Sequence, residues 1–295
     1  MTARRVLVTG ASGFTGRYVC EAFSRAGFNV DRWVTSKESD GFHIDMRDAG
    51  AVASAIAVAP PDMVVHLAAI SFVAHADVSE IYTTNIVATR NLLAALAGAP
   101  TRPSRVLLAS SANVYGNTEG SVGESELLSP QNDYAVSKMA MESMARLWVE
   151  YFPIFITRPF NYTGVGQAER FLIPKIVAHF QERKKEIELG NIDVFRDFGD
   201  VRDVADIYLK LATSAEGHWN IVNICTGVAT SVREIIGMLE QLSGHRIEVK
   251  QNPVFMRKNE IRMLTGDPTN LREMLGDPKR FSLMETLAWM LSSRT

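Results

Sequence analysis

The chain of 295 residues has only two cysteines, Cys20 and Cys225. Two thiols, one in an apparent helix and one in an apparent strand, are typical of core filling and not of a disulfide framework. This favours a reducing, cytoplasmic compartment. The net charge is −2, so no excess of either sign indicates affinity for nucleic acid or for a membrane surface. We therefore expect local arginine and lysine side chains to bind any anionic ligand.

Long hydrophobic runs are also missing. The most apolar stretch, residues 52–76, is interrupted by Pro60-Pro61-Asp62 and contains His66 and His75. It is typical of a helix, a turn and a strand, and not of a membrane span. The first residues lead directly into a strand pattern, so we expect no signal peptide. We find no internal repeat and no low-complexity tract, and the hydrophobic content of 46% is ordinary for a globular protein.

Strand-like and helix-like segments alternate along the first half of the chain. The predicted strands are 5–9, 28–34, 63–69, 105–110 and 154–158, and the predicted helices are 14–26, 46–59, 78–97 and 133–150. This alternation predicts an α/β fold with a doubly wound parallel sheet covered on both faces. After residue 159 we expect helices at 168–183, 201–213, 232–242, 270–275 and 284–291, and a strand at 219–224 that rejoins the sheet. The charged run 182–186 is interpreted as a solvated helix end.

A glycine-rich turn joins the first strand to the first helix, with the sequence Gly10-Ala11-Ser12-Gly13-Phe14-Thr15-Gly16. Gly10 permits the tight turn, Gly13 lets the backbone approach a ligand, and Gly16 lets the helix pack closely on the sheet. The helix N-terminus would present free N–H groups and its positive dipole end to a pyrophosphate. The placement predicts a dinucleotide-binding loop. Its expected ligand-binding residues are Gly10, Ser12, Gly13, Phe14, Thr15 and Gly16.

The end of the second strand bears on the choice between NAD and NADP. A carboxylate there would bind the ribose hydroxyls and repel a 2′-phosphate. The strand instead continues through Trp33-Val34-Thr35-Ser36-Lys37, where Thr35, Ser36 and Lys37 could bind a phosphate with help from Arg17. Asp31 would be the missing acid only if the strand ended earlier. We therefore expect NADP(H), with NAD(H) as the alternative.

A hydroxyl pair and an ammonium group follow later in the chain. Tyr134 and Lys138 are four residues apart, so a helix would project both from one face. A nearby ammonium favours the phenolate, so we expect it to lower the pKa of Tyr134 from its usual value of about 10. Ser111 ends a predicted strand and could hydrogen-bond a reacting carbonyl. We therefore predict Ser111, Tyr134 and Lys138 as the catalytic residues of a nicotinamide-dependent enzyme, with Lys138 also binding the nicotinamide ribose.

With these motifs the chain resembles the extended short-chain dehydrogenase/reductases that modify nucleotide sugars, over essentially its whole length. The resemblance implies that Asp45 contacts the adenine, that His66-Leu67-Ala68-Ala69 borders the cofactor, and that Asn85 stabilises the site. The cofactor-binding residues expected outside the glycine loop are Thr35, Asp45, Met46, Leu67, Ala68, Ala69, Tyr134 and Lys138.

The resemblance also implies a sugar-nucleotide site. Arg158-Pro159-Phe160-Asn161 matches the segment that leads into it, and Arg196-Asp197-Phe198 matches a signature whose arginine meets the substrate diphosphate. Residues 158–167 and 256–262 are similar to segments of reductases that act on GDP-4-keto-6-deoxy-mannose, which makes Arg257 a second diphosphate ligand. The substrate-binding residues expected are Ser71, Ser111, Asn161, Lys175, Arg196 and Arg257, with no metal.

The activity implied is reduction of the C4 ketone of a nucleotide-linked 4-keto-6-deoxy-hexose, of the GDP-4-keto-6-deoxy-mannose type, by NAD(P)H. Ala112 and Asn113 stand where the related 4,6-dehydratases carry acidic residues, which argues against elimination of water. The run 110–116 is also common among 4-epimerases, so an NAD-dependent nucleotide-sugar 4-epimerase is the alternative. A non-enzymatic nicotinamide-nucleotide-binding module is a third possibility, but such modules typically lose the Tyr or the Lys.

The chain is expected to form two interleaved units. We expect an NAD(P)-binding Rossmann domain over 1–160, rejoined by about 201–230, and a smaller α/β substrate-binding domain over 161–200 and 231–295. Related enzymes commonly dimerise through the helices that correspond to 78–97 and 133–150. We therefore expect a homodimer that binds a nucleotide sugar, most readily a GDP-linked one, and neither nucleic acid nor membrane.

Overall fold

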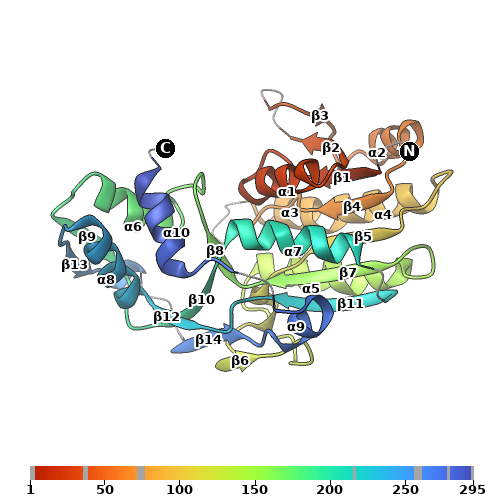
Figure 1. The fold of residues 1–295 in the computed structure, drawn as a ribbon. Helices are drawn as coiled ribbons and strands as arrows, with labels where there is room; N and C mark the ends of the chain where they lie inside the picture. The colour runs from red at the N-terminus through yellow and green to blue at the C-terminus, as the bar shows by residue number, and fades with distance from the viewer. Residues whose placement is uncertain are drawn as a thin grey trace.

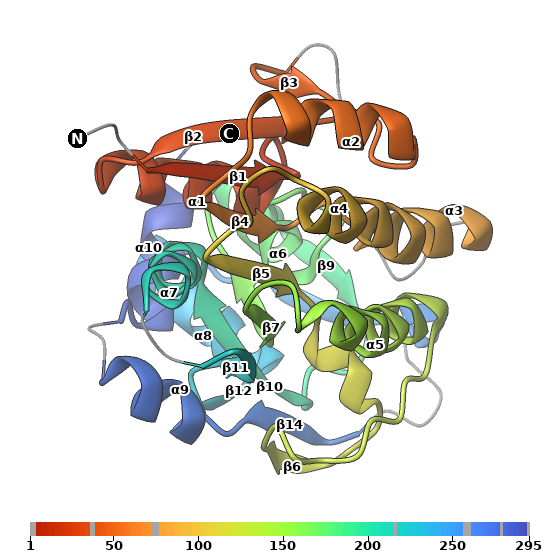
Figure 2. The same cartoon turned by 90° about the vertical axis from the view of Figure 1, so that its right-hand side faces the viewer.

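A seven-stranded parallel sheet forms the centre of the molecule, with the strand order β11-β7-β5-β4-β1-β2-β3 (Figures 1 and 2). The computed structural model describes residues 4–35, 39–71, 77–214, 217–255, 261–277 and 280–293. The sheet contains β1 (Arg5–Thr9), β2 (Asn29–Val34), β3 (Phe42–His43), β4 (Met63–His66), β5 (Arg105–Ala109), β7 (Ile154–Pro159) and β11 (Trp219–Ile224). The predicted doubly wound α/β fold is confirmed. The predicted late strand also rejoins the sheet, because β11 pairs with β7 in parallel.

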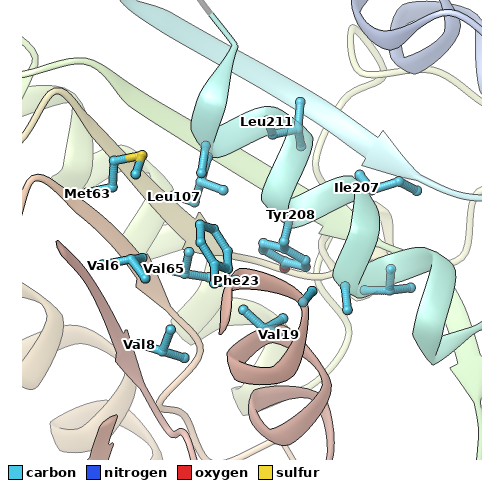
Figure 3. Packing of buried hydrophobic residues seen from close by; sticks show 14 of the residues in the cluster. Val6, Val8, Val19, Phe23, Met63, Val65, Leu107, Ile207, Tyr208 and Leu211 are labelled. Carbon is cyan, nitrogen blue, oxygen red and sulfur yellow. The ribbon is translucent and has the colours of Figure 1, made fainter. Parts of the chain in front are cut away.

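Helices cover both faces of this sheet. One face carries α1 (Phe14–Arg25) and α7 (Val201–Thr213), and the other carries α2 (Ala49–Val58), α4 (Ala88–Ala97) and α5 (Asp133–Ala145). Figure 3 shows α1 and α7 packed over β1, β4 and β5, with Phe23 and Tyr208 at their contact. Because both faces are covered, the central strands β1, β4, β5 and β7 are mostly apolar, which explains why their sequence signal is strong.

Several helix boundaries differ from the predicted ones. The predicted helix 46–59 begins only at Ala49, because the carboxylate of Asp48 caps it by accepting from the N–H groups of the next turn. The predicted helix 133–150 ends at Ala145 and continues as the 3₁₀ turn Arg146–Trp148. The predicted helix 78–97 contains α3 (Val78–Tyr82), the π-helical turn Thr83–Val87 and α4. Such π-helical turns frequently occur at functional sites.

Two small sheets that the sequence did not predict are formed mainly by the second half of the chain, together with β6 from the first half. One has the order β12-β10-β14-β6 with β8 beside β10, and the other pairs β13 with β9. The strands are β6 (Gly120–Val122), β8 (Asn161–Thr163), β9 (Glu186–Leu189), β10 (Phe195–Asp200), β12 (Ala229–Ser231), β13 (Glu248–Gln251) and β14 (Met263–Gly266). Two short 3₁₀ turns are Ala112–Tyr115, which follows β5, and Pro253–Phe255, which follows β13.

Four further helices belong to this second half: α6 (Leu172–Gln181), α8 (Val232–Ser243), α9 (Thr269–Leu275) and α10 (Leu283–Ser292). Of these, α6, α8 and α10 share a hydrophobic cluster with β9, and Figure 1 shows them beside the large sheet. The charged run 182–186 is only partly a helix end, because the helix stops at Gln181 and Glu186 already begins β9.

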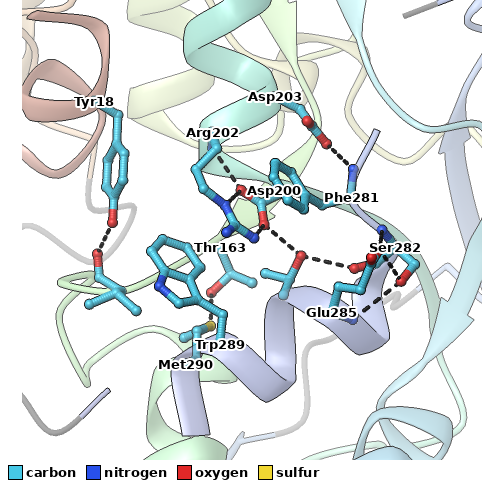
Figure 4. Close-up of polar contacts among 12 residues, drawn as sticks. Tyr18, Thr163, Asp200, Arg202, Asp203, Phe281, Ser282, Glu285, Trp289 and Met290 are labelled. Carbon is cyan, nitrogen blue, oxygen red and sulfur yellow. Dashed lines mark hydrogen bonds and ion pairs between the residues drawn. The ribbon is translucent and has the colours of Figure 1, made fainter. Parts of the chain in front are cut away.

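A polar cluster connects the start of α7 to α10 (Figure 4). Asp200 accepts hydrogen bonds from Arg202 at 2.6 Å and from the Thr286 hydroxyl at 2.7 Å. The Arg202 guanidinium also lies 3.6 Å from the ring centroid of Phe281 and 3.9 Å from that of Trp289. These contacts tie the C-terminal helix to a helix that covers the large sheet.

Both cysteines are free and buried. Cys20 lies in α1, and Cys225 lies immediately after β11, one residue beyond the predicted strand position. Burial raises the pKa of the Cys20 thiol to about 11 and raises that of Cys225 as well. Both thiols therefore stay protonated and fill the core. Within the described ranges, none of the helices is long and apolar enough to cross a membrane.

Because α1 and α7 pack closely on the sheet, a substitution that leaves a cavity there should lower the free energy of unfolding strongly. Leu107 is fully buried in this cluster, so Leu107→Ala should lower the free energy of unfolding by about 2–5 kcal/mol, measured by urea denaturation. Val58 on α2 is 85% exposed, and Val58→Ala should change it by less than about 0.5 kcal/mol. Equal effects of the two substitutions would contradict this packing.

Candidate active site

The glycine loop connects β1 to α1 in the way its sequence predicts. Gly10 has a φ of +68°, which disfavours any residue with a side chain. A Cβ at Gly16 would lie 2.1 Å from the carbonyl oxygen of Gly10, so the helix can lie this close to the strand end only with glycine there. Gly13 caps α1 without a side chain, which leaves N–H groups of the first turn free for an anion. This cradle fits a pyrophosphate.

Ser111, Tyr134 and Lys138 meet at the carboxyl edge of the sheet. Ser111 follows β5, while Tyr134 and Lys138 lie on consecutive turns of α5, and all three side chains are buried. The Ser111 hydroxyl lies beside the Tyr134 phenol and favours its ionised form. The Ser111 hydroxyl also accepts from the side chain of Asn113 at 3.1 Å. The structure therefore brings the predicted hydroxyl pair together beside the predicted ammonium.

The expected lowering of the Tyr134 pKa is wrong for this structure. Burial raises the pKa of Tyr134 to about 12, and only the Ser111 hydroxyl opposes this. The Lys138 ammonium lies 6.0 Å from the Tyr134 ring centroid and donates instead to the carbonyl of Ala109 at 2.7 Å. At neutral pH the phenol is therefore protonated and able to donate a proton.

Burial lowers the pKa of Lys138 to about 8, and the Glu142 carboxylate partly offsets this. Near neutral pH the side chain is thus mostly an ammonium held at the end of β5. His66, on β4, is kept neutral, because burial and the Lys138 charge lower its pKa to about 3. Its ring bonds to the hydroxyls of Thr9 and Thr89 at 2.7 and 2.8 Å. The imidazole therefore cross-links β1, β4 and α4.

Asn85 occupies the π-helical turn and braces the same region. Its side-chain amide donates to the carbonyl of Ile70 and to the hydroxyl of Ser137, and its carbonyl oxygen accepts from the Ile70 N–H at 2.8 Å. Ser137 lies on α5 between Tyr134 and Lys138. The widened turn thus joins the segment after β4 to the helix that carries the tyrosine and the lysine.

The other residues expected at the cofactor lie along the same edge. Ala68 approaches the glycine loop closely, since a Cβ on Gly10 would meet its backbone nitrogen at 2.8 Å. Leu67 and Ala69 flank it and are half-buried, and Met46 is buried after β3. Asp45 is exposed and accepts hydrogen bonds from Arg47, which lower its pKa.

The end of β2 is clear of acids among the residues that the structure describes. The strand ends at Val34, and exposed Thr35 follows. Asp31 is in the middle of β2, in register with Leu7, and pairs with Arg5 at 2.7 Å. It lines, with Trp33, a cavity of about 390 Å³ on the α2 side that none of the predicted site residues borders. Asp31 is therefore not the missing acid. Ser36 and Lys37 lie outside the described residues.

Contacts that the sequence did not predict join α1 to the segment after β7. The Thr15 hydroxyl lies 2.7 Å from the Tyr162 hydroxyl, and the Tyr18 hydroxyl donates to the Val165 carbonyl at 2.8 Å. Arg17, a candidate for phosphate binding, donates to the carbonyl of Gly166 at 3.0 Å. Helix α1, which follows the glycine loop, therefore also holds the loop that contains Val165 and Gly166.

The candidate substrate residues lie on several elements of the second half, with Ser71 near β4. Ser71 and Asn161 are exposed. Arg196, on β10, donates to the carbonyls of Phe195 and Ile261, and Lys175, on α6, donates to the carbonyl of Glu188. Arg257 lies outside the described residues. The substrate-binding roles expected for these residues therefore stay predictions.

A buried ion pair next to the site was not predicted: Arg158 belongs to the motif 158–161, but its partner Glu142 was not among the candidate residues. Glu142 on α5 and Arg158 on β7 are 4% and 3% exposed and form an ion pair of 2.6 Å. Glu142 also accepts a hydrogen bond from the Ser110 hydroxyl. A sequence signal existed, because Glu142 follows Tyr134 and Lys138 at the same spacing of four on one helix face.

The close approach of Gly10 and Gly16 can be tested directly. Gly16→Ala should displace α1, lower the unfolding free energy by about 1–3 kcal/mol and weaken NADPH binding at least about tenfold, measured by nucleotide fluorescence. Gly237 is the matched control, since it lies inside α8 with no atom within 4 Å of an added Cβ. Gly237→Ala should leave NADPH binding unchanged and raise stability slightly. Normal NADPH affinity in Gly16→Ala would contradict this account.

Comparison with known proteins agrees with this geometry. The model of the NAD dependent epimerase/dehydratase family matches residues 6–225. The chain is 35% identical to GDP-6-deoxy-D-talose 4-dehydrogenase of Aggregatibacter actinomycetemcomitans, with 96% of this chain and 95% of that protein covered. It is 32% identical to GDP-6-deoxy-D-mannose reductase of Pseudomonas aeruginosa, with 98% and 96% covered.

Solved structures show the same fold. The structure of RMD from Pseudomonas aeruginosa complexed with NADPH has a TM-score of 0.86 and 29% identity, with 98% of this chain and 97% of that chain covered. The glycine cradle, the buried Ser–Tyr–Lys group and these similarities all indicate the same family. The chain belongs to the NAD-dependent epimerase/dehydratase family, the extended short-chain dehydrogenase/reductases, and is an NAD(P)-dependent oxidoreductase or epimerase that modifies nucleotide sugars.

Proposed function

We propose that this protein reduces the C4 ketone of a GDP-linked 4-keto-6-deoxy-hexose with NADPH. The observation that carries the proposal is the buried Ser111–Tyr134 hydroxyl pair beside Lys138, at the sheet edge that holds the glycine loop. The substrate class is supported by two curated relatives at 35% and 32% identity, whose names both describe redox enzymes of GDP-6-deoxy-hexoses. A crystal structure described as a putative epimerase from Burkholderia cenocepacia is 47% identical and supports the epimerase alternative. UDP-glucose 4-epimerases match at 23–28%.

The proposed chemistry divides among the three side chains. A bound nicotinamide cofactor would supply the hydride. Tyr134, protonated at neutral pH because burial raises its pKa to about 12, would donate its proton to the developing alkoxide. Ser111 would hydrogen-bond the ketone oxygen and hold it against the phenol. Lys138, kept in place by the Ala109 carbonyl, would hold the ribose hydroxyls.

The cofactor would lie along the residues already placed at this edge. Gly10, Ser12, Gly13, Phe14, Thr15 and Gly16 would hold the pyrophosphate. Asp45, Met46, Leu67, Ala68 and Ala69 would contact the remaining parts of the nucleotide. NADP(H) is proposed over NAD(H), because β2 ends at Val34 and is followed by exposed Thr35 instead of an acid. The described acids near β2 are paired, Asp31 with Arg5 and Asp40 with Arg32.

The substrate end is proposed to rest on Ser71, Asn161, Lys175, Arg196 and Arg257. Fixing the diphosphate far from the reacting carbon would place the ketone within reach of the hydride, and such positioning accounts for much of the rate in bimolecular reactions. Arg196 and Lys175 donate to backbone carbonyls in this structure. They would therefore have to exchange those bonds for phosphate oxygens when the substrate binds.

A nucleotide-sugar 4-epimerase is the second candidate, favoured by the Ser110–Gly116 run and by the family model. The two differ in cofactor balance. We expect one NADPH to be consumed for each 4-keto sugar nucleotide reduced, measured at 340 nm alongside product analysis. Interconversion of C4 epimers without net use of cofactor would contradict the reductase and identify the epimerase. No turnover of any sugar nucleotide despite tight NADPH binding would favour a binding module.

We also propose a homodimer formed through α3, α4 and α5. Val87 and Leu147, on or next to these helices, are 45% and 75% exposed. Pairing such apolar side chains across an interface would remove them from water. Light scattering should give twice the chain mass at micromolar concentration, and a monomer would contradict the proposal.

The roles of Tyr134 and Lys138 can be separated by substitution. Tyr134→Phe removes one oxygen and keeps the ring, so turnover should fall roughly 10²- to 10⁴-fold while NADPH affinity persists. Lys138→Met should lose both turnover and NADPH affinity, because that ammonium is proposed to act in both. Tyr151 is 43% exposed, and Tyr151→Phe is the matched control that should change neither. Near-normal turnover of Tyr134→Phe would show that the proton comes from another group.

A further inference from the structure

A buried ion pair next to the site takes no part in the chemistry proposed above. Arg158 donates from Nε to Glu142 Oε1 at 3.0 Å and from Nη2 to Oε2 at 2.6 Å. Both side chains are almost fully buried. Removing two charges from water is costly, and such pairs are often no more stabilising than apolar residues of similar size. Stability alone is therefore a weak explanation for the pair.

The position of Glu142 suggests another explanation. Three residues spaced by four on α5 each contact one of three successive residues at the end of β5. Tyr134 lies beside Ser111, Lys138 donates to the carbonyl of Ala109 at 2.7 Å, and Glu142 accepts from the hydroxyl of Ser110. Glu142 thus makes one of three contacts that set the register between α5 and the end of β5.

Arg158 extends this arrangement to the turn that follows Ser111 and, through Tyr115, to β11. Its Nη1 donates to the Tyr115 hydroxyl at 3.0 Å and to the carbonyl of Glu124 at 3.1 Å. The Tyr115 hydroxyl in turn donates to the side chain of Asn223 on β11 at 2.7 Å. Glu142 therefore cannot shift without disturbing the strand that carries Arg158 and the turn that follows Ser111.

We propose that Glu142 is a positioning residue, which holds Ser110 and thereby keeps Ser111 and Lys138 in register with Tyr134. The proposal rests on the roles proposed above for the Ser–Tyr–Lys group. It assigns a function to a carboxylate that neither contacts the expected hydride path nor belongs to the motifs that predicted the site.

The charge of Glu142 gives this role a measurable signature. The groups that face Lys138 are Glu142 and Tyr134 from α5 and His66 from β4. His66 is neutral above about pH 3 and Tyr134 stays protonated, so Glu142 supplies the charge that favours the ammonium. Without that charge, and with Arg158 left unpaired beside it, the pKa of Lys138 should fall further. Lys138 would then lose its proton at a lower pH.

The test compares Glu142→Gln with Glu142→Asp. In protein labelled with ¹³C-lysine, the Cε resonance of Lys138, assigned with a Lys138→Arg variant, reports its titration without substrate. Glu142→Gln should move the midpoint about one pH unit or more toward acid and lower kcat at least about tenfold. Glu142→Asp keeps the charge but is shorter, so the midpoint should stay near that of the unmodified protein while kcat still falls. Glu150→Gln, an exposed control beyond α5, should change neither.

An unchanged Lys138 midpoint in folded Glu142→Gln would overturn the proposal and leave the pair a purely structural one. If that variant does not fold, Ser110→Ala tests the positioning role instead, because it removes only the hydrogen bond to Glu142 and keeps the ion pair with Arg158. It should lower kcat about tenfold with NADPH affinity within about threefold, since a lost hydrogen bond to a charged group has roughly this effect. Full kcat in Ser110→Ala would also overturn the proposal. Failure of the proposed function would show differently. The unmodified protein would then not turn over GDP-4-keto-6-deoxy-mannose, while Glu142→Gln would still move the Lys138 midpoint toward acid as expected.

Discussion

The contact between Gly10 and Gly16 is the constraint on which the rest of the site depends. Because Gly16 has no side chain, α1 begins directly against the carbonyl of Gly10, at the carboxyl edge of the sheet. The first two turns of the helix then reach the second half through Thr15 and Tyr18, which contact Tyr162 and Val165. One close approach between backbone segments therefore places both the cofactor loop and the loop that leads toward the substrate half.

Burial decides the protonation of the catalytic side chains more than their mutual charge does. The spacing of Tyr134 and Lys138 suggested an ammonium that lowers the tyrosine pKa, but the ammonium is bonded to the carbonyl of Ala109. In low dielectric each group favours its neutral form, so the tyrosine pKa rises and the lysine pKa falls. A protonated phenol suits a site that must donate a proton to an alkoxide.

The parts of the fold that sequence predicts are those whose signals are local. The central strands of the large sheet, β1, β4, β5 and β7, are mostly apolar runs, and the glycine loop and the Tyr134–Lys138 pair have short fixed spacings. The small sheets have no such signal. β6 and β14 pair residues as far apart as Gly120 and Leu264, and strands such as β6, β10 and β12 mix glycine or polar residues with apolar ones instead of forming apolar runs. The π-helical turn at Asn85 likewise depends on its partners Ile70 and Ser137.

Long cationic side chains explain why the substrate site was harder to predict than the catalytic one. A lysine or arginine can reach many partners, and tertiary structure selects among them. Arg17 was a candidate for phosphate binding and holds the Gly166 carbonyl, while Arg158 lies in a matched motif and pairs with buried Glu142. A glycine, or a tyrosine fixed on a helix, can reach far fewer partners. The sequence therefore predicts the catalytic residues, because they lie on rigid elements with short fixed spacings. The residues that determine substrate specificity are harder to predict, because their partners come together only in the folded chain.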